Sequence, residues 1–320
     1  MTSKKNYIPS LGGMPKYLNL LTDFGFKRIF GDKELLIAFL NALFEKEGKV
    51  VKSVRYINKE MTPINKDDRT IFYDVLCKVD KGEDFILEMQ HKPQDTFRER
   101  AIFYMSRAID NQGRGKKKWN YKLTPVYGIF ITNFHLREVD LPDAPITEIV
   151  MKNRETNKIF TDKFRMFFLD LLAFDKKNEE ECETNLDNWI YSIKYSGSMS
   201  TRPQMANSSP IFNKLYSMAE LAAMTTRQRN QYEVSLKRHW DMLADQDTTR
   251  NRIKRAHTEG LVEGRAEGLE EGRAEGRAEG RAEGRAEEKM ENARKFKLAG
   301  VDIEVICQCT GLSRQDIESL

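Results

Sequence analysis

The chain has 320 residues, of which 40% are hydrophobic and 32% charged, and its net charge is +4. This composition excludes a chain that is disordered throughout and allows one or two domains with a substantial core, while the mild positive charge permits contact with nucleic acid without requiring it. No apolar run reaches the roughly 20 residues that span a bilayer, and the first residues lack the apolar stretch of an export signal, so we expect a cytoplasmic protein with no membrane partner. Four scattered cysteines and four scattered histidines give neither a disulfide framework nor a zinc site.

Apolar periodicity along the chain predicts helices and strands in alternation. The predicted elements are a helical region over 16–46 that breaks at Gly31–Asp32, strands over 50–57, 71–79 and 84–90, a helix over 96–112, a strand over 123–134, and a hairpin over 146–153 and 163–171. From 177 to 258 the pattern is helical, with an interruption at 197–210. This order predicts an α/β fold, with a mixed sheet flanked by helices in a core over 1–175 and a helical extension over 176–258.

A four-residue repeat occupies 259–288, where glycine recurs at every fourth position from Gly260 to Gly284, mostly in Arg-Ala-Glu-Gly units. Each glycine inside a helix costs about 1 kcal/mol relative to alanine. The repeat also places like charges four residues apart, which removes the usual opposite-charge support for a helix. Two interpretations stay open: a solvated linker of partial helicity, or a glycine stripe through which copies of the chain form a homo-oligomer.

The last segment, 289–320, contains two short predicted helices around the sequence Thr-Gly-Leu-Ser. The second helix starts with a capping-box pattern at Ser313 and Asp316. The pair resembles a helix-turn-helix unit, but Arg314 is the one cation on its second helix, whereas phosphate affinity needs several cations. We therefore interpret the segment as a small helical hairpin that caps the tail or contacts a partner.

The stretch DFILEMQ predicts a buried strand that nevertheless carries Glu88 and, two residues later, Gln90. A three-residue loop that ends in Gly82, with this glycine in the left-handed region, places Asp74 of the preceding strand opposite Glu88. Asp74, Glu88 and Gln90 then share one face of the sheet. Adjacent carboxylates repel each other unless a divalent cation joins them, and hard oxygen ligands suit Mg²⁺ or Mn²⁺. The alternative is that both carboxylates lie at strand ends and face water.

This pattern, D-x13-E-x-Q across a hairpin with a helix before and after it, resembles the PD-(D/E)XK nuclease core. More closely, the chain resembles the recombination-promoting nuclease and transposase family within that superfamily. The resemblance rests on a D-x-x-F-K segment at 23–27, on the E-x-Q strand, and on Arg98, Arg100 and Tyr104 in the following helix. It covers roughly residues 16–170.

The resemblance implies a metal-dependent DNA endonuclease associated with recombination or transposition, in which Asp74 and Glu88 bind Mg²⁺ or Mn²⁺ and Gln90 orients water or phosphate. It also suggests Asp23 as a helix-borne third ligand, while the position of Asp23 before an apolar run makes an N-cap the equal alternative. Two departures from the superfamily are Tyr73, where a proline often stands, and Gln90, where a lysine stands. The missing lysine bears on the catalytic rate more than on metal binding.

Several cations are candidates for contact with DNA phosphates, beside Trp119 and Tyr121 as stacking residues: Lys27, Arg98, Arg100, Arg114, Lys116, Lys117 and Lys118. For each cation alone, solvated surface charge is the alternative. The competing hypothesis for the whole chain is a weak or inactive module, in which the nuclease-like core is a platform that binds DNA or protein and the tail drives assembly.

Overall fold

The structure is a computed structural model that describes residues 15–57, 60–61, 71–72, 74–80, 82–94, 96–114, 119–135 and 144–320. Its α-helices are α1 (Asp23–Phe30), α2 (Lys33–Leu43), α3 (Phe97–Gly113), α4 (Asn185–Tyr195), α5 (Met205–Ser208), α6 (Pro210–Ala219), α7 (Thr226–Leu298), α8 (Ile303–Thr310) and α9 (Arg314–Ser319). Its strands are β1 (Val54–Tyr56), β2 (Glu60–Met61), β3 (Ile71–Phe72), β4 (Val75–Val79), β5 (Asp84–Gln90), β6 (Val126–Thr132), β7 (Ile146–Lys152) and β8 (Ile159–Asp170). The chain divides into two compact units, Met1–Asp245 and Gln246–Leu320.

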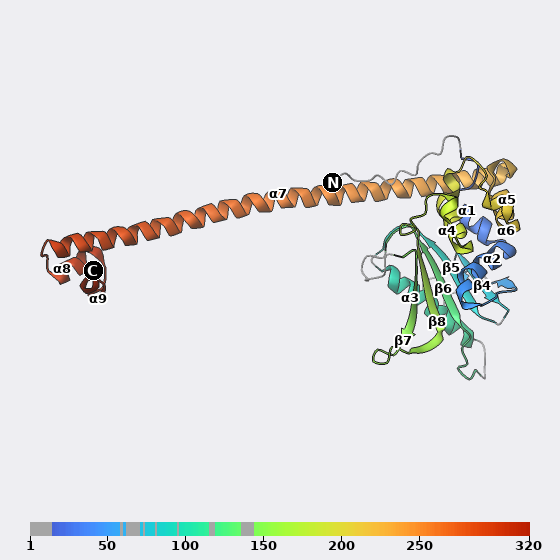
Figure 1. Ribbon diagram of the computed structural model, residues 1–320, viewed down its shortest axis with the longest axis horizontal. Helices are drawn as coiled ribbons and strands as arrows, with labels where there is room; N and C mark the ends of the chain where they lie inside the picture. The colour runs from blue at the N-terminus through green and yellow to red at the C-terminus, as the bar shows by residue number, and fades with distance from the viewer. Residues whose placement is uncertain are drawn as a thin grey trace. The chain divides into compact units, whose positions relative to one another are not determined.

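A mixed six-stranded sheet in the order β1-β4-β5-β6-β8-β7 forms the centre of the first unit (Figure 1). The central strands β5, β6 and β8 are parallel neighbours, whereas β1, β4 and β7 each pair antiparallel with the strand beside them. Every residue of β6 is buried, as expected for a parallel strand that is covered on both faces. The predicted α/β class with a mixed sheet is therefore confirmed.

Helix α3 covers one face of this sheet. Its residues Phe97, Ala101 and Met105 pack with Ile86 of β5 and Phe130 of β6 in one hydrophobic cluster. The helix approaches closely because β6 carries glycine at 128, where an added Cβ would lie 2.7 Å from the Met105 sulfur. Met105 is fully buried under the helix, whereas Tyr104 is half-buried.

The opposite face is covered by α1, α2, α4 and α6, which share a second and larger cluster. Trp189 of α4 stacks on Phe30 of α1 with ring centroids 5.9 Å apart, and it meets Phe39 of α2 and Phe212 of α6 edge-on or tilted. This core crosses the boundary that we expected at residue 175. Periodicity predicted the helices beyond 175 but carried no information on where their apolar faces dock.

Some of the predicted boundaries of helices and strands agree with the structure, and others do not. The expected break at Gly31–Asp32 is confirmed, and the Asp32 side chain caps α2 by accepting hydrogen bonds from the backbone N–H groups of Glu34 and Leu35, both at 3.1 Å. The single strand predicted over 71–79 is instead divided into β3 and β4. Helix α7 runs through the boundary expected at 258 and through the glycine repeat. Within the described ranges, no helix combines the length and the apolar character needed to cross a membrane.

The two tryptophans Trp189 and Trp240 provide a matched test of how far the core extends, since one is 1% exposed and the other 59%. We expect Trp189→Ala to lower the free energy of unfolding by about 3–5 kcal/mol, because a large cavity is left between α1, α2 and α6. Trp240→Ala should change it by about 0.5 kcal/mol or less. Urea unfolding followed by circular dichroism measures both. A loss below about 1 kcal/mol for Trp189→Ala would show that residues beyond 175 do not belong to the core.

Candidate active site

The β4–β5 hairpin determines which side chains meet. Gly82 has φ +78°, its N–H donates to the Val79 carbonyl at 2.8 Å, and the Val79 N–H donates to the Glu83 carbonyl at 3.0 Å. The ladder pairs Val75 with Leu87, so the next position places Asp74 opposite Glu88. The predicted loop and register are confirmed.

The two carboxylates lie side by side at the end of this ladder. The backbone N–H of Asp74 donates to Glu88 Oε1 at 3.0 Å, and the backbone N–H of Met89 donates to Asp74 Oδ2 at 3.0 Å. Glu88 is 7% exposed, and the Asp74 side chain is 24% exposed. Each carboxylate is thus held by the backbone of the opposite strand, with Asp74 nearer to solvent.

Burial raises the pKa of Glu88 from 4.5 to about 8, and the negative charge of Asp74 adds to the increase. The Asp74 backbone hydrogen bond and the positive charges of Arg100 and Lys27 act in the opposite direction without cancelling it. At neutral pH the site therefore holds a proton on one buried carboxyl group. A cation bound between the carboxylates would replace that proton.

Lys27 of α1 brings a positive charge to the pair. Its Nζ lies 3.9 Å from Asp74 Oδ1, and it also forms an ion pair with Asp23 one turn earlier in the same helix. The helix can approach because Gly25 has no side chain: a Cβ there would lie 2.3 Å from the Asn19 carbonyl oxygen. Gly25, in the middle of the D-x-x-F-K segment, therefore allows the close packing of α1 that brings Lys27 near Asp74.

Asp23 does not cap α1, so the N-cap alternative is wrong. Thr22 is the cap, and its side-chain oxygen accepts a hydrogen bond from the Gly25 N–H at 3.1 Å. The Asp23 side chain is 65% exposed and pairs with Lys27. Among the residues that the structure describes, no three His, Cys, Asp or Glu side chains gather as a metal-ligand set. A ligand role for Asp23 thus stays a prediction.

Arg100 and the backbone of Lys92 hold the two ends of the Gln90 carboxamide. Arg100 Nη2 donates to Gln90 Oε1, and Gln90 Nε2 donates to the Lys92 carbonyl at 3.1 Å. Tyr104 follows Arg100 by one turn of α3, and its pKa is raised by burial and by the charge of Glu88. Arg100 and Tyr104 therefore reach the carboxylate pair from the helix that covers this face of the sheet.

The other cations predicted to contact DNA do not gather around the carboxylate pair as Lys27 and Arg100 do. Arg98 is half-buried on α3. Arg114 donates to Asp110 at 2.9 Å, at the end of α3 where Gln112 contacts Asp84 at the start of β5. Fourteen residues separate Arg100 from Arg114, which is about 20 Å along a helix. The basic residues Lys116, Lys117 and Lys118 lie outside the described residues.

Sequence reasoning missed the contribution of α7 to this site. The Ser235 hydroxyl accepts a hydrogen bond from the Phe24 N–H at 3.1 Å, and the His239 ring lies 4.9 Å from the ring of His91, the residue after Gln90. Lys92 and Asp245 form an ion pair at 3.1 Å. The start of α7 thus supports both chain segments that carry site residues. No local sequence signal links positions that lie 153 or 211 residues apart.

The raised pKa of Glu88 makes a prediction for the protein without metal. The folded state retains the Glu88 proton up to about pH 8, whereas the unfolded chain releases it near 4.5, so this contribution to the free energy of unfolding is complete below pH 4.5 and is lost as pH rises through 8. At about 1.4 kcal/mol per pKa unit, the loss amounts to a few kcal/mol. Glu88→Gln should remove this slope in urea unfolding measured from pH 5 to pH 9. Asp23→Asn, which removes an exposed carboxylate nearby, should keep it; equal slopes in wild type and Glu88→Gln would contradict the assignment.

The comparisons with known proteins agree with this geometry. The family model described as PD-(D/E)XK nuclease family transposase matches residues 20–248. No curated protein and no solved structure matches the chain. The matched range contains the sheet, the carboxylate pair, the helices α4 and α6 that complete the core, and the start of α7. Because the match extends over more than half of the 320 residues, the chain belongs to the PD-(D/E)XK nuclease family of transposases.

Proposed function

We propose that the protein is a metal-dependent DNA endonuclease, which hydrolyses phosphodiester bonds in recombination or transposition. The observation that supports this most strongly is the pairing of two carboxylates, the buried Glu88 and the partly exposed Asp74, at the end of the β4–β5 hairpin. Membership of a nuclease family makes DNA the expected substrate. The proposal includes a cytoplasmic location and an oligomeric assembly that depends on the C-terminal residues.

The donor set suits Mg²⁺ or Mn²⁺. Mg²⁺ is commonly held by one or two carboxylates, with water and substrate phosphate as its other ligands, so Asp74 and Glu88 are enough without a third side chain. The raised pKa of Glu88 also fits, because a bound cation relieves the repulsion between the carboxylates. When bound, the ion polarises the phosphate and lowers the pKa of water. Since binding displaces the Glu88 proton, affinity should rise with pH.

Lys27 takes the place of the superfamily lysine in this proposal. The strand position of that lysine holds Gln90, a carboxamide that cannot titrate. Lys27 instead brings its ammonium group from α1 to within 3.9 Å of Asp74. There it can contact a non-bridging phosphate oxygen and stabilise the negative charge that develops during hydrolysis. Arg100 orients Gln90 and is placed to hold a neighbouring phosphate.

DNA bound along α3 would contact both groups of predicted cations. Arg100 lies beside the carboxylates, and Arg114 lies about 20 Å away at the other end of the helix. At 3.4 Å per nucleotide along one strand, this distance corresponds to about six nucleotides. We therefore propose that Arg100 binds near the cleaved bond and that Arg114 binds the flanking duplex.

Cleavage of supercoiled plasmid in Mg²⁺ or Mn²⁺ tests the reaction. We expect the full-length protein to nick or linearise the plasmid, EDTA to stop it, and Asp74→Ala or Glu88→Ala to lower the rate at least about 100-fold, because each removes a ligand. Asp23→Ala should lower it less than about tenfold if this residue is not a ligand. Gel electrophoresis over time measures all four proteins.

Absence of cleavage in the wild type, combined with DNA binding that is unchanged in Asp74→Ala, would support the alternative of a non-catalytic platform. Cleavage that persists in both carboxylate variants would place the reaction elsewhere in the molecule.

Lys27 has a separate test. Lys27→Ala should lower the cleavage rate by about 100- to 1000-fold, the usual effect of removing a group that stabilises transition-state charge. Lys27→Arg should restore part of the rate. Lys33→Ala, which removes an exposed cation at the start of α2, is the matched control and should keep it. Mn²⁺ affinity, measured by calorimetry, should not fall in Lys27→Ala; a loss of metal binding would make Lys27 a structural partner of the carboxylates.

A further inference from the structure

The hairpin of β7 and β8 projects beyond the rest of the sheet. Strand β8 pairs with β6 over residues 164–170, so residues 159–163 of β8 continue past the start of β6. Five strand residues extend by about 17 Å. The projecting end, residues 151–163, is called the hairpin tip below. It lies at the edge of the sheet where β5 begins and α3 ends, and the carboxylate pair lies toward the other edge.

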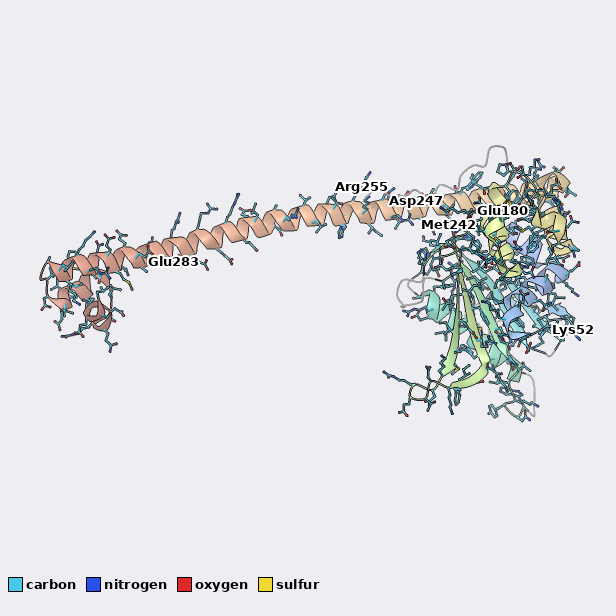
Figure 2. The ribbon with its side chains drawn as sticks, in the orientation of Figure 1. Lys52, Glu180, Met242, Asp247, Arg255 and Glu283 are labelled. Carbon is cyan, nitrogen blue, oxygen red and sulfur yellow. The ribbon has the colours of Figure 1, made fainter. Side chains whose placement is uncertain are left out.

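The hairpin tip is exposed, yet its backbone is fixed. Every residue from 151 to 160 is exposed, and the side chains of the tip project into solvent (Figure 2). The Asn153 N–H donates to the Lys158 carbonyl at 2.8 Å, and Asn153 Oδ1 accepts from the Thr156 N–H at 2.7 Å. Asn157 takes the left-handed conformation, with φ +57°, which asparagine tolerates in turns. The tip is thus a preformed protrusion.

Apolar side chains of the hairpin tip lie outside both hydrophobic clusters of the sheet. Phe160, Ile159 and Met151 are 79%, 58% and 46% exposed. A register shift between Val150 and Met151 separates them from the regular part of the ladder, because β8 bulges there. A bulge bends its strand and redirects the side chains that follow. The tip therefore presents an aromatic and two aliphatic side chains that the fold itself does not use.

Charge indicates what contacts the hairpin tip. Residues 151–163 contain four cations and two acidic side chains, a net charge of +2. Arg165, further along β8, is neutralised by Glu47 and Glu148, whereas none of the tip cations forms a salt bridge within the described ranges. Unpaired cations suit phosphates, and exposed apolar side chains beside them suit bases. In a chain of a nuclease family this combination favours DNA.

The sheet register determines how far the hairpin tip lies from the carboxylates. Glu88 pairs with Phe130, and Phe130 pairs with Phe168 of β8. Phe160 precedes Phe168 by eight residues, which is about 26 Å along the strand, and β8 lies two strands, about 10 Å, from β5. The combined distance of about 28 Å corresponds to about eight base pairs. A duplex laid along α3 would pass Arg114 and then reach the tip.

We propose that the hairpin tip is a second DNA-binding element, which enters the major groove of the duplex about eight base pairs from the cleaved bond. A two-stranded β-ribbon is narrow enough for this groove. Lys152, Arg154 and Lys158 contact phosphates beside the groove, and Phe160 contacts the edges of bases. The tip thereby holds the flanking duplex in line with α3. The inference rests on the proposed function for the identity of the substrate and for the position of the cleaved bond.

Fluorescence anisotropy of the full-length protein with a labelled duplex of about 24 base pairs tests the hairpin tip, in EDTA so that the DNA stays intact. The double variant Lys152→Ala, Lys158→Ala should weaken binding at least about tenfold and lower the slope of log affinity against log salt by about 1.8, because each phosphate contact contributes about 0.9. Phe160→Ala should weaken binding about fivefold with the slope unchanged, because it removes an apolar contact with bases. On a stem of about six base pairs, which spans only about 20 Å, both effects should fall below about twofold.

Matched controls come from the other side of the sheet, before the edge strand β1. Lys46→Ala with Lys52→Ala removes two exposed cations, and Val50→Ala shortens a 62% exposed apolar side chain. Both should bind like wild type. A wild type that does not bind the duplex, tip variants that bind it as wild type does, or an equal loss in the controls or on the short stem would overturn the proposal. Binding is measured without metal, so a protein that binds through the tip but does not cut DNA would contradict the nuclease proposal alone.

Discussion

The repulsion between Asp74 and Glu88 is the constraint on which the site depends. Two carboxylates on adjacent strands, one of them buried, cannot both be charged without compensation. The structure reduces the cost in three ways: backbone N–H groups donate to both carboxylates, Lys27 and Arg100 lie nearby, and Glu88 keeps its proton to about pH 8. This arrangement destabilises the fold relative to apolar residues at the same positions, because apolar side chains would pack there without an electrostatic cost. A cation bound between the two carboxylates would relieve this repulsion.

The supports of this pair come from distant parts of the chain. The hairpin fixes the two strands locally, but the position of Lys27 depends on how α1 packs beside the turn at Asn19. That turn is held in place by α7, where the Tyr232 hydroxyl accepts a hydrogen bond from the Asn19 N–H at 3.0 Å. The buried Trp189 core holds the same helix from the other side. The nuclease unit therefore needs residues well beyond the strands that carry its carboxylates.

This distribution explains which features could be predicted. The register of Asp74 against Glu88 was predictable because one loop with Gly82 determines it, and strand alternation then brings Gln90 to the same face. The N-cap of α1 was misplaced by one residue, because Thr22 and Asp23 are both good caps and only the backbone decides between them. The docking of α4, α6 and α7 was not predictable, since an amphipathic pattern shows that a face is buried but not against what.

The exchange of lysine for glutamine in the strand has a physical consequence. A lysine at position 90 would place its ammonium group beside Arg100, and two like charges in a half-buried site repel each other. Gln90 avoids that cost and gives Arg100 a neutral acceptor. In the proposed mechanism, Lys27 supplies the missing charge from a side chain that is 39% exposed, where water still solvates it. A cation on a solvated helix can reach a phosphate and withdraw from it, whereas one fixed in the strand could not. The proposed role of Lys27 would thus place a positive charge at the site without a buried ammonium group.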